Sequence, residues 1–575
     1  MPRQTGLLGW HVVNLRADHF VEYWIPAKPV RRMKFKFSSG ARGIFGALAS
    51  ILIALGTGCH AQQGPAGQLS PLENTVTLRR GLGGEPGTLD PGAAVDSFSL
   101  EVLGDLYEGL TAETADGSIV PGVAAWWTVD SAGKKYEFHL RHDARWSNGA
   151  PVRAQDFVNA WRRLVDPKQA SPMADNLRVI VGAGDIIAGH AIPSSLGVLA
   201  PRDDVLQVVL TRPAPYFPQL LTHYSAFPVF SESAARSHDS RTWVSNGAYV
   251  LSSWTPGGTL QLQKNPSYWD RDHVGIANVI YVPLPDENAE CLRYRAGELD
   301  LTQSVPAAAL ASIRAETPNE LHIAPFLGTM YYAFNLRAAP FKTNVALRKA
   351  LVMAVDRRAI LKSIQPFGQQ PAFGFVPPGT WNYQPQSWDW ADTPDATRIA
   401  EAKLSYAKAG FSIQTPLHLK LLFNSSPGIK QIAIAIAAMW RETLGIETEL
   451  IDEEYRVFLD SRKHSPRWDV VRLAWLADYN DAGSFLDTFR SDSPNNDSGY
   501  DSPQFNALIE EAENTADVEK RREILEMTEK IMLADYPVIP IYFLSSKRLF
   551  KPYIRGETAN PLNRLYSKHL TIEAH

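Results

Sequence analysis

Apolar and polar residues alternate along the chain with the two periods of regular secondary structure. Residues 75–82 (TVTLRRGL) and 136–141 (YEFHLR) have the alternation of short strands. Residues 154–167 place aromatic and aliphatic side chains on one helical face, and Pro167 ends that predicted helix. Leucines three or four positions apart predict another helix over 99–110.

Later segments combine the two periods into larger units. Residues 245–269 contain two alternating runs around the turn TPGG, which predicts a hairpin. Residues 417–450 form the most regular pattern of the chain, because a strand, an amphipathic helix closed by Gly445 and a second strand follow one another. Two capped helices between 503 and 534 precede the apolar strand VIPIYF. Helices alternating with strands predict an α/β fold.

One predicted strand ends in a charge. The run 469–478 (DVVRLAWLAD) is almost wholly apolar, and it finishes at Asp478 between Trp475 and Tyr479. A carboxylate at the end of a buried strand is costly unless a cation meets it. We therefore expect a positive group beside Asp478, either a ligand or the nearby Arg472.

Composition limits the architecture and the chemistry. The chain has 575 residues, 45% of them hydrophobic, which is enough for two or three domains. It has only two cysteines, so neither a disulfide framework nor a multi-cysteine metal site is expected. We expect Cys291 to be a small buried side chain.

The N-terminus has the pattern of an export signal. Basic residues precede an apolar run at 44–55, which is too short to cross a bilayer comfortably. Cys59 follows it, in the manner of the acylated cysteine of bacterial lipoproteins, and 60–74 has the composition of a tether. We expect lipidation at Cys59, with an ordinary cleaved signal peptide as the alternative. Acidic residues within 1–32 make Met33 an alternative start.

Charge and motifs exclude several function classes. The chain after residue 59 has 49 basic and 59 acidic residues, a formal charge of −10, which argues against nucleic acid as a partner. No HExxH, GxSxG or GxxxxGK[ST] motif occurs, and Pro86 interrupts the only near-match to a dinucleotide fingerprint. No later stretch reaches transmembrane length, so we expect the mature chain to be exported and soluble. The lack of catalytic motifs favours a binding protein over an enzyme, and we expect neither a cofactor nor a metal.

Five sequence blocks follow one another over nearly all of the mature chain, at 121–172, 246–270, 293–302, 339–357 and 470–489. The last block contains the segment ADYN. Together these blocks resemble the oligopeptide-binding proteins of bacterial ABC importers, in the branch that includes murein-peptide binders.

The resemblance implies a fold and a domain organisation. The fold would be a two-lobed clamshell of the type II periplasmic-binding-protein class, with three domains around an extended peptide. After the leader of 1–59 and the tether of 60–74, the first domain would join 75–108, 232–327 and 545–575. The second would be 109–231, and the third 328–544.

The resemblance also implies a ligand site. Asp478 would bind the α-ammonium of a peptide, in a dry site where such a pair is strong. Eight further positions would line the peptide: Trp475, Arg472, Arg462, Tyr455, Ala477, Met173, Ser97 and Val95. Strand-like backbone pairing would be independent of the ligand's side chains.

The chain departs from the family pattern at several of these positions. Met173 replaces an expected tyrosine, and Val95 replaces an acidic residue. Gly328 and Leu476 stand where close relatives have a disulfide. These differences affect ligand length and carboxylate recognition, whereas the amine anchor is kept.

The leading hypothesis is a non-enzymatic peptide receptor that is monomeric, anchored in the cell envelope or periplasm, and coupled to a permease with separate ATPase subunits. A murein-peptide receptor of the same fold is the closest alternative. An exported hydrolase using Asp478 and Asp481 as acid and base is a second, although two carboxylates on one short segment are poorly placed to face each other across a substrate. A chaperone for unfolded chains is a third.

Overall fold

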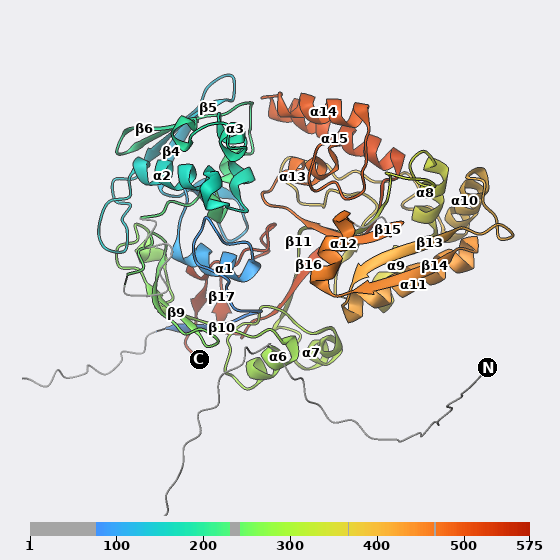
Figure 1. Cartoon of the computed structure of the whole chain (residues 1–575). Coiled ribbons are helices and arrows are strands. Elements are labelled where there is room, and N and C mark those ends of the chain that lie inside the picture. Colours follow the sequence, from blue (N-terminus) through green and yellow to red (C-terminus); the bar gives the residue numbers. More distant parts are fainter. Residues whose placement is uncertain (1–75, 231–241, 366, 465–466) are drawn as a thin grey trace, which may run out of the picture. The chain divides into compact units, whose positions relative to one another are not determined.

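Three large sheets organise the chain, as the computed structural model shows for residues 76–230, 242–365, 367–464 and 467–575. One sheet has the order β4–β5–β7–β6 and is antiparallel throughout. Its strands are β4 (Ala124–Val129), β5 (Lys135–Leu140), β6 (Val198–Arg202) and β7 (Val205–Val209). Helix α2 (Ala154–Val165) packs against it through the apolar face that the sequence predicts (Figure 1).

A second sheet joins strands from distant parts of the sequence. Strand β1 (Thr77–Leu82) pairs in parallel with β10 (Asn278–Pro283), and the order continues through β9 (Leu260–Lys264) to β8 (Tyr249–Trp254). The antiparallel pair β8–β9 confirms the predicted hairpin. One hydrophobic core contains residues of both four-stranded sheets.

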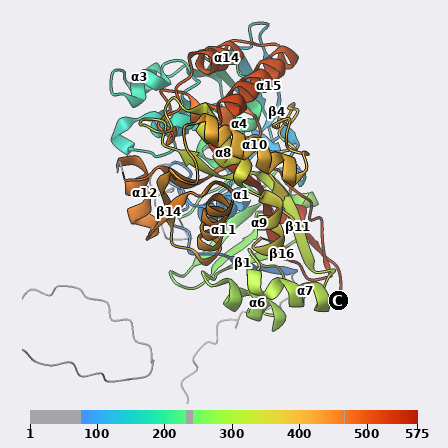
Figure 2. The same ribbon diagram turned by 90° about the vertical axis from the view of Figure 1, so that its right-hand side faces the viewer.

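The third sheet has six strands in the order β12–β16–β11–β15–β13–β14. Its strands are β11 (Leu321–Phe334), β12 (Gln370–Pro371), β13 (His418–Asn424), β14 (Glu447–Glu453), β15 (Val470–Leu476) and β16 (Val538–Leu549). Strands β13 and β14 are parallel, and α11 (Pro427–Leu444) packs along them, which confirms the predicted strand–helix–strand unit (Figures 1 and 2). A second hydrophobic core belongs to this sheet.

Helix ends follow the local signals in most places. Gly445 closes α11 in the left-handed conformation at φ 75°. The side chain of Ser502 accepts a hydrogen bond at the start of α14 (Pro503–Glu513), and that of Asp517 does so at the start of α15 (Val518–Asp535).

The end of one helix was predicted wrongly. Helix α1 (Ser97–Leu106) stops before Leu110, the last leucine of the pattern. The backbone N–H of Glu108 donates to Asn246 Oδ1 at 3.2 Å, and the side chain of Asn246 also donates to the carbonyl of Glu108 at 2.9 Å. A distant side chain thus takes the backbone groups that a longer helix would use.

The remaining elements are short or peripheral. They are α3 (Ala183–Ile187), α4 (Phe217–Leu220), α6 (Glu287–Arg295), α7 (Leu310–Glu316), α8 (Val345–Ala354), α9 (Arg357–Ser363), α10 (Asp395–Lys408), α12 (Tyr455–His464), α13 (Gly483–Leu486), β2 (Thr111–Glu113), β3 (Ile119–Pro121), β17 (Ile554–Arg555) and β18 (Thr571–Ile572). Cys291 is buried in α6, as expected. Within the described ranges, no helix has both the length and the apolar character that crossing a bilayer requires.

Two of the predicted domain boundaries, 327/328 and 544/545, fall inside long strands. Strands β11 and β16 pair antiparallel across the positions 327/328 and 544/545, with register shifts between Pro325 and Thr329 and between Met330 and Tyr331. They extend from the second core to a small third cluster that includes Leu549. The three-domain division stays a prediction, as do the leader, tether and Cys59, which lie outside the described residues.

Candidate functional site

A hollow lies beside the end of β15, and its lining comes from segments far apart in the sequence. Residues of α1, of the turn at 222–227, of 476–478 and of 562–566 line it, together with Gln303. Its volume is about 220 Å³. Pockets that enclose a whole small ligand usually measure about 300–1,000 Å³, so this hollow accommodates one end of a short ligand.

Two acidic residues line this hollow, Glu101 and Asp478, and Asp478 is the one without an ion-pair partner among the described residues. Its backbone N–H donates to Ser484 Oγ at 3.1 Å, and its carboxylate forms no ion pair with another described residue. Asp478 is an exposed residue, yet the protein around the hollow desolvates its carboxyl group and raises the pKa of Asp478 to about 6, while the Arg564 guanidinium acts in the opposite direction. Near neutral pH the group is therefore a carboxylate.

The segment after β15 is fixed by hydrogen bonds to Ser484 and to strand β11. The indole Nε1 of Trp475 donates to the carbonyl of Ser484 at 2.6 Å, so Ser484 holds both Trp475 and Asp478. The backbone N–H of Ala477 donates to the carbonyl of Leu327 at 3.0 Å. These contacts fix the backbone at Asp478, so its carboxyl group needs little reorganisation to meet a ligand.

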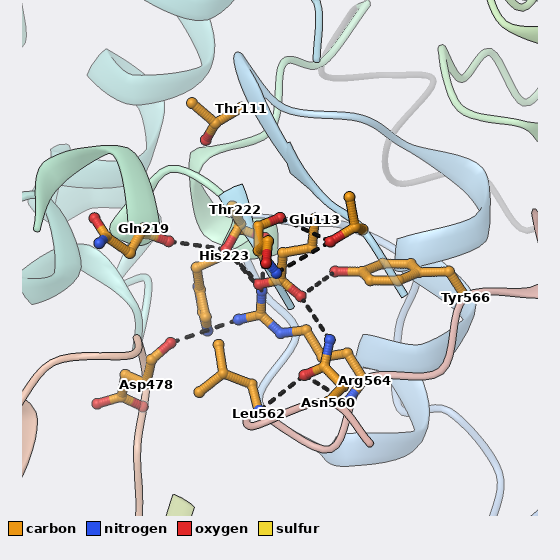
Figure 3. A network of polar contacts seen from close by, with 12 residues as sticks. Thr111, Glu113, Gln219, Thr222, His223, Asp478, Asn560, Leu562, Arg564 and Tyr566 are labelled. Atoms are coloured by element: carbon orange, nitrogen blue, oxygen red, sulfur yellow. Dashed lines mark hydrogen bonds and ion pairs between the residues drawn. The ribbon is translucent and has the colours of Figure 1, made fainter. Parts of the chain in front are cut away.

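The opposite wall carries a guanidinium that the sequence did not reveal. Arg564 Nη1 lies 2.6 Å from Glu113 Oε1 and donates to Thr222 Oγ1 at 2.8 Å (Figure 3). Glu113 is buried, and it also accepts from Asn560 at 3.2 Å and from Tyr566 at 3.3 Å. Residues 562–566 are called the C-terminal wall below.

The third side of the hollow is polar but uncharged. Burial and, to a smaller extent, the Arg564 charge lower the pKa of His223 to about 3, so the imidazole is neutral under physiological conditions. The Tyr224 hydroxyl donates to the carbonyl of Ala94 at 2.9 Å, and burial raises the pKa of this phenol. These groups can donate or accept hydrogen bonds without adding charge.

Three of the nine predicted ligand-binding residues meet in this hollow, namely Ser97, Ala477 and Asp478. Ser97 is the first residue of α1. Val95, two residues earlier, is 58% exposed, and Met173 packs partly buried against the first core. The hollow lining does not include either of them.

The other predicted residues lie along β15 and α12. Arg472 Nη1 donates to Asn424 Oδ1 at 3.3 Å, and burial lowers the pKa of Arg472. The alternative that Arg472 neutralises Asp478 is therefore wrong. Arg462 lies 3.7 Å from Asp497, and Tyr455 is 56% exposed.

The second carboxylate of the hydrolase alternative is not available. Asp481 is buried, and it forms a bidentate pair with Arg521, with distances of 2.7 and 2.8 Å. The backbone N–H of Gly483 also donates to Asp481 Oδ1 at 2.8 Å. A carboxylate held this way supports the loop and cannot act as acid or base toward a substrate. In the part of the chain that the structure describes, no cluster of His, Cys, Asp or Glu is arranged to hold a metal ion.

Gly328 and Leu476, for which the resemblance implies a disulfide in related proteins, are neighbours in the third sheet. Gly328 on β11 lies directly opposite Leu476 on β15. A side chain at Gly328 would meet Leu544, whose Cδ1 lies 2.5 Å from the ideal Cβ position. Cys291 is a buried free thiol.

Comparison with known proteins identifies the class. The family described as bacterial extracellular solute-binding proteins, family 5 Middle, matches residues 118–497. The chain therefore belongs to family 5 of the bacterial extracellular solute-binding proteins. The α/β fold with two lobes that the sequence predicts is confirmed by its structural relatives.

Individual relatives cover almost the whole chain. The periplasmic oligopeptide-binding protein OppA of Salmonella typhimurium is 38% identical over 537 residues, which cover 92% of this chain and 98% of that protein. The structure of the Escherichia coli murein tripeptide binding protein MppA has a TM-score of 0.76 at 35% identity and covers 88% of this chain and 99% of its own. Haemophilus influenzae OppA in complex with RPPGFSPFR has a TM-score of 0.73 at 34% identity, covering 87% and 100%. These relatives are named as binding proteins and not as enzymes.

Proposed function

We propose that this protein is the extracytoplasmic receptor of a peptide ABC transporter. It binds short peptides between its two lobes and delivers them to a membrane permease whose ATPase subunits are separate chains. Similarity to proteins named for oligopeptide and murein tripeptide binding supports this assignment. So does a site with hydrogen-bonding groups but without a second free acid or base.

One observation carries the proposal: the carboxylate of Asp478 lies in the hollow without an ion-pair partner among the described residues. The carboxylate is exposed to the hollow and thus open to a ligand, and a bound ammonium would form a charge-assisted pair with it. A free α-amino group is the cation that every unmodified peptide carries. We therefore assign the ligand's N-terminus to Asp478.

The rest of the ligand extends beyond the hollow in this proposal. Ser97 and Ala477 contact its first residue, and Trp475 and Arg472 lie along the strand that leads away from Asp478. Arg462, Tyr455, Met173 and Val95 are proposed to line later positions of the peptide. Hydrogen bonds to the ligand backbone and water between side chains then allow many sequences.

Calorimetry with a mixed tripeptide library tests the assignment. Tripeptides with a free amine should bind, and the same peptides acetylated at the amine should not, because acetylation removes the charge that pairs with Asp478. Folded protein that binds no free-amine peptide would refute the receptor function. Equal affinity for both forms would refute the amine anchor alone.

A cell-wall peptide is the second candidate ligand, favoured by the similarity to murein tripeptide binding protein MppA. Competition between a murein tripeptide and ordinary tripeptides for the same protein distinguishes the two. A murein peptide that displaces the others at equal concentration would identify the narrower receptor.

We also propose that the protein acts as a monomer with three domains, held at the cell envelope by a lipid on Cys59. The sequence of the leader supports the anchor. Mass spectrometry of protein extracted from membranes should find the lipid on Cys59. A mature N-terminus without lipid would show an ordinary cleaved signal.

A further inference from the structure

Three charged side chains line the hollow within the described residues: Glu101, Asp478 and Arg564. Glu101 already has its partners, because Arg80 lies 2.9 Å from Oε2 and Arg548 lies 3.6 Å from Oε1. Gln303 also donates to Glu101 at 2.6 Å. Glu101 is therefore satisfied by the protein itself, which leaves Asp478 and Arg564 to face a ligand.

Arg564 is held in one orientation from behind. Nη1 contacts Glu113 at 2.6 Å and both the hydroxyl and the carbonyl oxygen of Thr222, at 2.8 and 3.2 Å (Figure 3). Glu113 has a side chain that is 1% exposed, whereas that of Arg564 is 20% exposed. The buried acid thus holds one edge of the guanidinium, and the other edge remains on the side of the hollow.

The second nitrogen of Arg564 has little to bind in the protein. Nη2 makes a long contact of 3.5 Å with the backbone carbonyl of Asp478. A guanidinium offers five N–H donors in a fixed plane, and one such plane can bridge two carboxylates through its two edges. Glu113 and Thr222 bind Nη1 of Arg564, and the Tyr566 hydroxyl is a further partner of the guanidinium. Nη2, with its long contact, lies next to the residue that is proposed to bind the ligand's amine.

We propose that Arg564 is a specificity-determining residue that binds a carboxylate of the ligand close to its free amine. The preferred substrates are then short peptides with an acidic side chain in their first or second residue. This inference rests on the proposed function, because it takes Asp478 as the amine anchor. The ligand's ammonium and carboxylate would meet an acid and a guanidinium that line the same hollow.

Matched tripeptides test the inference on the unmodified protein. Glu-Ala-Ala is compared with Gln-Ala-Ala, and Ala-Glu-Ala with Ala-Gln-Ala, by calorimetry at neutral pH. In at least one pair we expect the acidic peptide to bind about tenfold tighter, the effect of one charge-assisted hydrogen bond. The pair Ala-Ala-Glu and Ala-Ala-Gln is the positional control and should show no such ratio, because the charge lies too far from Arg564.

A double variant removes the guanidinium without leaving a buried charge. The change Glu113→Gln with Arg564→Gln replaces both members of the pair, so it avoids the large loss of stability that an unpaired Glu113 would cause. The Glu/Gln affinity ratio should fall to about 1. Arg202→Gln, an exposed arginine on β6, is the matched control and should keep the wild-type ratio.

The outcomes separate the two proposals. Equal affinity for Glu and Gln peptides in the wild-type protein, or an unchanged preference in the double variant, would overturn the role of Arg564 and leave the receptor function intact. Absence of binding for all six peptides would overturn the receptor function itself. A preference lost in the double variant and kept in Arg202→Gln supports the assignment.

Discussion

Asp478 and the amine of a peptide titrate on opposite sides of neutrality, and together they set the pH range of binding. Burial raises the pKa of Asp478 to about 6. Below that pH the free protein takes up a proton, and the ligand's ammonium loses its partner. An α-amino group has a pKa of about 8, so the ligand loses its charge above that value. Peptide affinity should be greatest near pH 7 and fall on both sides.

Calorimetry from pH 5 to pH 9 measures this profile. In Asp478→Asn the fall on the acidic side should disappear, and affinity at pH 7 should drop by about 3 kcal/mol, as for removal of one partner of a buried charge pair. Asp204→Asn is the control, because Asp204 pairs with the exposed Arg202 and lies outside the hollow. A wild-type affinity that stays constant between pH 5 and pH 7 would contradict the anchor.

Single residues also show where prediction from sequence stops. Asp478 was found because an apolar run ending in an acid is unusual for a buried strand. Arg564 lies in an irregular segment, PLNRLY, whose local pattern indicates neither burial nor a partner. Its partner Glu113 is 451 positions away, so only the folded chain brings them together.

At the scale of elements, the loop after β15 depends on one buried ion pair. Arg521 of α15 binds both oxygens of Asp481, and the side chains of both are nearly inaccessible to solvent. Asp481→Asn leaves the guanidinium of Arg521 buried without a counter-charge. We expect the free energy of unfolding to fall by about 3 kcal/mol or more.

Urea denaturation measures this loss. The double variant Asp481→Asn with Arg521→Met should recover part of it, because no buried charge remains unpaired. An exposed pair such as Arg202 and Asp204 provides the comparison, since removing one partner there should change stability by less than about 1 kcal/mol. Equal losses at both pairs would show that burial of Asp481 is not the cause.

Elements were predictable where the signal was local. The caps Ser502 and Asp517 and the glycine at 445 were correct because each acts on its own helix end. The end of α1 was wrong because Asn246, from a different part of the sequence, binds the backbone at Glu108. The register that sets Gly328 opposite Leu476 agrees with the expected disulfide position, which came from family resemblance and not from the residue pattern.

At the scale of the whole described unit, contacts join the loop after β15 to the sheet of β4–β7. The ring of Tyr479 stacks on Tyr216 at 4.9 Å between centroids, and Arg521 lies 5.1 Å from the Tyr216 ring. Tyr216 adjoins Ala214, whose carbonyl accepts from Tyr136 of β5 at 2.9 Å. Tyr479, which directly follows Asp478, thus contacts the part of the molecule that contains the sheet of β4–β7.

Tyr216→Ala should weaken peptide binding. The stack of Tyr216 on Tyr479 favours the arrangement in which the loop after β15 and the part that contains the sheet of β4–β7 both face the ligand. An aromatic pair contributes about 1 kcal/mol, so we expect about a fivefold loss of affinity at neutral pH. The position of the pH optimum should stay the same, because the ionising groups are unchanged. Trp126→Ala removes another stack, that on His139 of β5, and serves as the control with unchanged affinity.

The assembly of distant segments limits what the sequence alone can predict. The fold class followed from the order of periodic segments and from the resemblance to a family. The composition of the hollow did not, because its walls come from α1, the turn at 222–227, the loop after β15 and the C-terminal wall. Periodicity describes each of these segments separately and contains no information on which of them meet.

Residues 478–481 make several different contacts within one short segment, and this has a consequence for how such receptors diversify in evolution. Asp478 faces the hollow, Tyr479 contacts Tyr216, and Asp481 holds Arg521, so most substitutions in this segment alter several properties at once. In the C-terminal wall only Arg564 is charged, and it can change only together with its buried partner Glu113, whereas the other wall residues are uncharged and lie outside the strands. New ligand preferences should therefore arise during evolution by mutation of these other wall residues, while Asp478 is inherited unchanged.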